Sequence, residues 1–112
     1  MKLITKQLEK TLAKYPLYSQ DGKGMDAVVI AKFFMPGTVW TWYALEAEKQ
    51  PDGDILFYGY VEGLESEYGY FTLKQISSVK NRWGLGVERD MYFNVGKTTL
   101  AEVLGKTEKV SK

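Results

Sequence analysis

The chain has 112 residues and a mass of 12.8 kDa, which gives room for a single domain over residues 1–112 and not for two. It contains no Cys and no His, so disulfides, thiolate nucleophiles, imidazole-based triads and the common zinc sites are excluded. The net charge of +1 is too near neutral for nonspecific binding to nucleic-acid phosphates.

The apolar residues form no long uninterrupted segment. Charged residues interrupt the first twelve positions, which is not the pattern of a secretory signal. The longest clearly apolar stretch, residues 27–31, is far too short to span a bilayer. We therefore expect a cytoplasmic protein with no membrane contact.

The first predicted element is a helix over residues 5–15. Thr5 is a suitable N-cap, and Pro16 cannot continue the helix. Apolar residues recur at a spacing of four, which places them on one side of the helix: Ile4, Leu8 and Leu12.

Three strands are predicted next, over residues 27–34, 39–48 and 55–62, with turns at Pro36-Gly37 and at residues 51–54. Such short turns favour an antiparallel meander. The first strand has apolar residues at both odd and even positions, and therefore on both of its faces, which is typical of the interior of a sheet. One face of the third strand is amphipathic and aromatic, with Leu56, Tyr58, Tyr60 and Glu62.

The C-terminal half alternates short strands and helices. We predict a strand over 69–71, a helix over 73–80 and a strand over 91–95. The middle helix would be capped by Thr72 and would bury Leu73, Ile76 and Val79. Thr98 would cap a last helix ending near Gly105, before a frayed tail over 105–112.

The predicted fold class is therefore α+β. An antiparallel β-meander of about four to five strands would be accompanied by an N-terminal helix, a middle helix and a short C-terminal helix.

Acidic residues gather in the middle of the chain. Residues 44–70 carry seven acidic and one basic residue, whereas the segments before and after them are net positive. Such charge can simply keep loops soluble, or it can match a positively charged nucleic-acid channel on a partner. Under the second interpretation the partner-binding residues are Asp52, Asp54, Glu62, Glu65, Glu67, Arg82 and Trp83.

Two further groups have alternative interpretations. Glu88 and Asp90, on either side of Arg89, could be the centre of a carboxylate-dependent, metal-assisted hydrolase, or part of a structural ion-paired network. The tryptophans could fill the core, or could contact a partner. A module for single-stranded nucleic acid would use Trp40, Trp42 and Lys97.

Several phrases occur together in a familiar order: Lys32-Phe33-Phe34, Trp40-Thr41-Trp42-Tyr43, DILFYGYVEG from Asp54, EYGYFTL from Glu67 and GLGVERD from Gly84. Over roughly residues 3–95 the chain resembles a family of small domains of unknown function carried by bacterial mobile elements. Some members of that family look like anti-CRISPR proteins that inhibit type II effector nucleases.

The resemblance implies a non-enzymatic inhibitor or accessory protein that binds an RNA-guided nuclease and blocks DNA targeting. It supplies no catalytic residues. We accordingly expect no catalytic site, no metal and no small-molecule cofactor, and we do not expect direct binding of nucleic acid.

Overall fold

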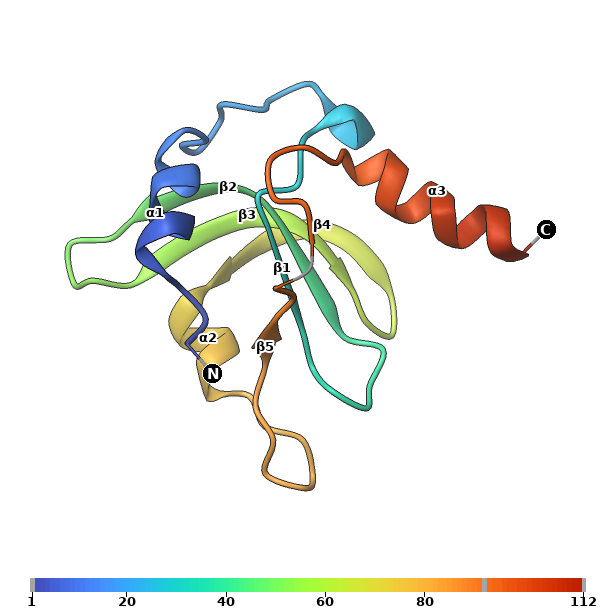
Figure 1. Cartoon of the computed structure of the whole chain (residues 1–112). Helices are drawn as coiled ribbons and strands as arrows, with labels where there is room; N and C mark the ends of the chain where they lie inside the picture. Colours follow the sequence, from blue (N-terminus) through green and yellow to red (C-terminus); the bar gives the residue numbers. More distant parts are fainter. Residues whose placement is uncertain (1, 92, 112) are drawn as a thin grey trace.

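The computed structural model describes residues 2–91 and 93–111, and side chains as far as Gly105 (Figure 1). In this part of the chain five antiparallel strands form one sheet in the order β4-β3-β2-β1-β5. The strands are β1 (Ala31–Phe34), β2 (Thr41–Lys49), β3 (Ile55–Glu62), β4 (Ser66–Thr72) and β5 (Glu88–Arg89). The helical elements are α1 (Lys6–Ala13), the 3-10 turn η1 (Gly24–Asp26), α2 (Leu73–Ser78) and α3 (Leu100–Ser111). The predicted α+β class, meander and three helices are confirmed.

Helices α1 and α2 cover one face of the sheet, which we call the core face (Figure 1). The ring of Phe57 lies between those of Phe33 and Phe71, with centroids 5.6 and 5.2 Å away. Leu8, Leu12 and Ile76 bring the helices onto these rings. Burying each such side chain stabilises the fold by about 1.5–3 kcal/mol, so this layer is the main source of stability.

The opposite face carries five tyrosines and is called the tyrosine face: Tyr43, Tyr58, Tyr60, Tyr68 and Tyr70. Strand register sets Tyr60 between Tyr43 on β2 and Tyr68 on β4. Leu100, at the start of α3, covers the Tyr43 end. The β4 end stays open, and α3 extends away from the sheet (Figure 1).

A β-bulge at Leu45 decides which β2 side chains reach each face. Ala44 pairs with Gly59, and the next pair is Glu46 with Tyr58, so Leu45 is an extra residue. Beyond the bulge Ala47 lies on the core face and Glu46 on the tyrosine face. A regular strand would have placed them the other way round, because side chains alternate between faces.

Strand boundaries differ from prediction in every strand but β3. β2 runs from Thr41 to Lys49 rather than over 39–48. β1 begins at Ala31 and not at residue 27, although the segment before it is buried and donates Ile30 N–H to Ala44 O at 2.8 Å. β4 is longer than the predicted 69–71. The predicted strand over 91–95 is wrong, because the strand that pairs with β1 there is β5.

Helix ends also differ. α1 stops at Ala13, and α2 stops at Ser78, so Val79 lies past its end and is 40% exposed rather than buried. Thr99, not Thr98, caps α3: its Oγ1 accepts from Glu102 N–H at 3.2 Å. The last helix continues to Ser111. The predicted frayed tail covers residues 105–112, and the side chains beyond Gly105 lie outside the described residues. In the described part of the chain, no helix combines the length and apolarity needed to cross a membrane.

Candidate protein-interaction surface

Three turns lie close together at one end of the sheet, and we call them the three-turn surface. They are residues 35–40 between β1 and β2, residues 63–65 between β3 and β4, and the loop 79–86 (Figure 1). Two tryptophan contacts connect them. The end of the sheet therefore presents parts of the chain that are far apart in sequence as one surface.

Trp40 connects the first two turns. Its ring stacks on that of Trp42 with centroids 6.0 Å apart and also contacts Gly63. A Cβ at position 63 would overlap the Trp40 ring, so any larger residue there would push the ring aside. Trp42 is 8% exposed and belongs to the core, whereas Trp40 is partly exposed.

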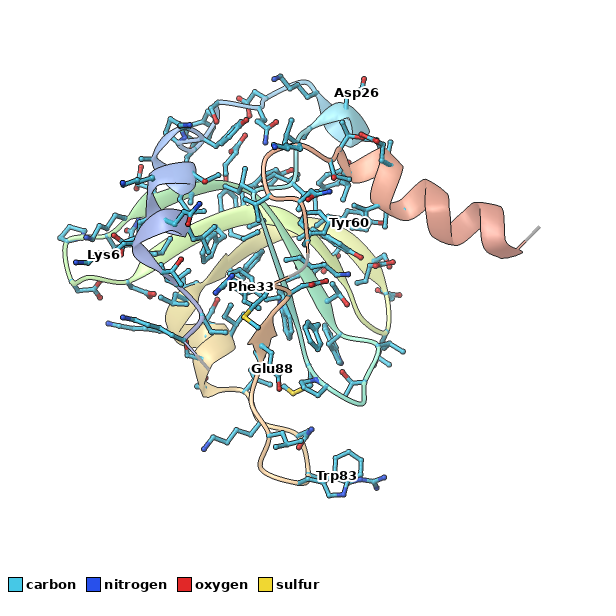
Figure 2. The ribbon with its side chains drawn as sticks, in the orientation of Figure 1. Lys6, Asp26, Phe33, Tyr60, Trp83 and Glu88 are labelled. Atoms are coloured by element: carbon cyan, nitrogen blue, oxygen red, sulfur yellow. The ribbon has the colours of Figure 1, made fainter. Side chains whose placement is uncertain are left out.

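Trp83 connects the third turn to the first. Its ring approaches Gly37, where a Cβ would lie 3.3 Å from the ring. Asn81 donates its side-chain N–H to Pro36 O at 3.2 Å and accepts from Trp83 N–H at 2.9 Å. The Arg82 guanidinium lies 4.8 Å from the Trp83 ring centroid. Trp83 is nevertheless 63% exposed, and it extends away from the body of the molecule (Figure 2).

Apolar side chains at the tips of these turns are left in solvent. Leu64 is 90% exposed and Val39 66% exposed, beside the partly exposed Trp40 and Trp83. Large apolar and aromatic groups gathered on rigid turns are typical of the energetic centre of a protein interface. Sequence reasoning missed Leu64 and Val39. The available signal was an apolar residue in a turn, where polar residues are usual.

Carboxylates surround this apolar group. Glu65 and Glu67 are exposed in the β3–β4 hairpin, and Lys80 and Arg82 provide two positive charges in the third turn. Glu62 is different: it is half-buried and accepts the hydroxyl of Tyr43. Burial, and then the charge and hydrogen bond of Glu62, raise the pKa of Tyr43 well above its ordinary value.

Five of the seven predicted partner-binding residues thus lie at or beside the three-turn surface: Glu62, Glu65, Glu67, Arg82 and Trp83. Asp52 and Asp54 do not, because they lie in the β2–β3 turn at the opposite end of β3. Seven residue steps along a strand separate the two ends by about 23 Å. Asp52 and Asp54 therefore do not share one surface with the other predicted partner-binding residues.

The aspartates at that opposite end are used within the fold. Asp54 Oδ1 accepts from Ile55 N–H at 2.8 Å and from Lys74 N–H, in the first turn of α2, at 3.0 Å. Asp52 accepts from the Lys74 ammonium at 2.9 Å. Hydrogen bonds, first from the backbone of Asp54 and then from Lys74, lower the pKa of Asp52. These carboxylates hold α2 onto the hairpin.

The charged triplet that suggested a hydrolase is divided by its strand. Arg89 pairs with Phe33, while Asp90 lies beside Lys32, with its Oδ2 3.4 Å from Nζ. Glu88 instead borders an open hollow next to α2. Among the described residues, no three Asp or Glu side chains gather as a metal site. The ion-paired interpretation fits Asp90.

The nucleic-acid alternative is not supported by the positions of its residues. Trp42 faces the core and offers no ring for stacking on a base. Lys97 lies near α1, beside Thr11, and not near the exposed ring of Trp40. The three residues therefore do not form one binding surface.

Comparison with protein families matches residues 3–111 to the model of a protein of unknown function, DUF2958. The chain belongs to the DUF2958 family. This match confirms that the chain is a member of a family of unknown function and covers more of it than the expected residues 3–95. No curated protein and no solved structure matches the chain.

Proposed function

We propose that this DUF2958 protein is a non-enzymatic binding protein that attaches to a partner protein through the three-turn surface. Apolar anchors on the turns would enter a pocket or groove of the partner. Glu65 and Glu67 would face basic residues around it. The partner class we propose is an RNA-guided nuclease of a type II CRISPR system, whose DNA channel has the complementary charge.

One observation carries this proposal: exposed apolar side chains and the exposed carboxylates of the β3–β4 hairpin share one end of the sheet. Apolar anchors supply affinity when they are desolvated at the centre of an interface. Charges at the rim increase the rate of association and select the partner. The mobile-element and anti-CRISPR connection rests on the sequence resemblance alone.

The test is a plasmid-interference assay with a type II effector, followed by co-purification of the effector with this protein. The native chain should restore plasmid survival and co-purify. The double variant Glu65→Lys/Glu67→Lys should lose at least tenfold in apparent affinity, because two attractive rim charges become repulsive. Glu62 is left unchanged, since it accepts the Tyr43 hydroxyl.

A matched control variant makes the same change in net charge at two surface positions away from the three-turn surface. Glu9 on α1 and Glu48 at the far end of β2 are both exposed, and the variant Glu9→Lys/Glu48→Lys should inhibit like the native chain. Trp83→Ala should weaken binding further without loss of the fold. Equal loss in the two charge variants would reject the three-turn surface. No inhibition by the native chain against a panel of effectors would reject the nuclease as partner.

A further inference from the structure

A separate pocket lies on the tyrosine face, between the sheet and the loop that precedes η1. Its volume is about 330 Å³. The sheet contributes Leu45, Glu46, Tyr58 and Tyr68, and the loop side contributes Gln20, Asp21, Gly22, Gly24 and Ala27. This pocket combines two aromatic rings with two carboxylates and lies apart from the three-turn surface.

The carboxylate of Glu46 is the central feature of the pocket. Glu46 is only 3% exposed, and its two oxygens accept from Tyr18 N–H at 2.8 Å and Gln20 N–H at 2.9 Å. Among the side chains that the structure describes, no Lys or Arg nitrogen comes within 4.0 Å of it. A carboxylate has about four acceptor positions, so two remain for a ligand. A buried negative charge is strongly stabilised by a cation.

Tyrosine rings form the wall beside this carboxylate. The rings of Tyr58 and Tyr68 are nearly parallel, with 9° between their planes and 6.2 Å between centroids. Strand register places Tyr58 directly next to Glu46. The faces of aromatic rings attract cations, and the attraction is stronger where water is excluded. The tyrosine rings and the Glu46 carboxylate therefore both favour a cationic ligand.

The loop wall is held in place before any ligand arrives. The Gln20 side chain accepts from Val28 N–H at 2.7 Å and donates to Val28 O and Leu45 O. Gly22 and Gly24 have positive φ angles of 78° and 53°, which other residues rarely adopt. Tyr18 is also at a positive φ of 72°, held there by its bond to Glu46. A rigid wall reduces the entropy lost on binding.

We infer that this pocket binds the guanidinium group of an arginine. A guanidinium is planar, stacks on aromatic rings, donates in a fork to a carboxylate and is less strongly hydrated than an ammonium. Asp21 at the rim adds a second negative charge. The inference does not depend on the proposed function, because it concerns different residues on a different face.

The test is an NMR titration of the isotope-labelled chain with N-acetyl-arginine amide. Saturable shifts are expected at the amides of Gln20, Glu46 and Tyr58. The neutral isostere, N-acetyl-citrulline amide, should bind at least tenfold more weakly, and N-acetyl-lysine amide about fivefold more weakly. Citrulline binding as well as arginine, or an absence of saturable shifts around the pocket, would overturn the inference.

Variants separate the pocket from the rest of the molecule. Tyr68→Leu should weaken arginine binding at least fivefold, because it removes one ring from the wall. Trp83→Leu removes an exposed aromatic ring from the three-turn surface, outside the pocket lining, and should change the affinity less than twofold. Equal effects of the two substitutions would contradict the assignment.

Two further measurements complete the design. Glu46→Gln should abolish detectable binding of N-acetyl-arginine amide. A thermal melt establishes whether this variant folds. If it does not fold, the affinity of the Tyr68→Leu variant tests the pocket instead. A five-residue peptide with a central arginine carries the same guanidinium as the free amide. If the peptide binds more tightly than the free amide, the natural ligand of the site is an arginine of a protein partner. If the two bind equally, the natural ligand is a small guanidinium compound.

Discussion

The two ends of β3 carry acidic residues of the same kind in opposite roles. At the β2–β3 end, Asp54 is buried and bonds to the first turn of α2, and Asp52 bonds to Lys74. At the β3–β4 end, Glu65 and Glu67 are exposed beside an apolar group. A carboxylate next to a helix N-terminus is used to satisfy backbone donors, whereas one in a hairpin with no helix nearby stays available. Acidic composition therefore identifies a binding surface only where local structure leaves acceptor positions of the carboxylates unused.

The largest effect is expected at the centre of β3, between the two ends. A Cβ on Gly59 would overlap the backbone carbonyl of Tyr43 on β2, which cannot move without breaking the pairing of the strands. Gly59→Ala should therefore lower the free energy of unfolding by about 3 kcal/mol or more. Urea denaturation measures this loss. Gly69→Ala, where nothing lies within 4 Å of the added group, is the matched control and should stay close to the native value.

A direct comparison of the two ends pairs Asp54→Ala with Glu65→Ala. The first leaves two backbone N–H groups without their acceptor and should lower the free energy of unfolding by about 2 kcal/mol. The second removes an exposed carboxylate and should leave stability almost unchanged. Urea denaturation of both variants measures the difference. Equal losses would mean that the two ends do not differ as described.

Glu62 sharpens the comparison, because it lies at the exposed end but has an internal partner. Tyr43→Phe removes the hydroxyl that Glu62 accepts and should lower the free energy of unfolding by about 1 kcal/mol at pH 8. The raised pKa of Tyr43 gives the pH dependence its sign. The unfolded chain ionises Tyr43 near pH 10 while the folded chain keeps it neutral, so stability is lost as the pH rises above about 10. Unfolding curves at pH 8 and 11 should accordingly lie closer together for Tyr43→Phe than for the native chain.

Local patterns in the sequence were enough to predict most of the sheet. Alternating residues and the Pro51–Asp54 turn placed β3 at residues 55–62, as the structure has it. β5 could not be found this way, since two residues form a strand only by pairing with Phe33 and Phe34 of β1. Val79 shows the same limit for helices. Its spacing from Ile76 suits a buried helical face, but the helix ends one residue earlier.

The candidate surface was predictable in part. Charge identified Glu65 and Glu67, and the aromatic content pointed to Trp83. The predicted meander already puts residues 35–40 and 63–65 at one end of the sheet, but nothing in the local sequence adds residues 79–86, because that depends on the contact of Trp83 with Gly37. The separation of Asp52 from Glu65 could have been foreseen. Consecutive turns of a meander lie at opposite ends of the strand between them.

The bulge at Leu45 determines which face of the sheet each following β2 side chain reaches. One extra residue in β2 turns Ala47 inward onto the rings of the core and Glu46 outward to Tyr58. A β2 that ran regularly through Leu45, without the bulge, would exchange the two, placing a charge among phenylalanines and a methyl group where Tyr18 and Gln20 need an acceptor. Deleting Leu45 would instead leave Ala44 opposite Gly59 and Glu46 opposite Tyr58 as they are now, so the two faces of β2 are compatible with loss of the extra residue but not with its inclusion in regular pairing.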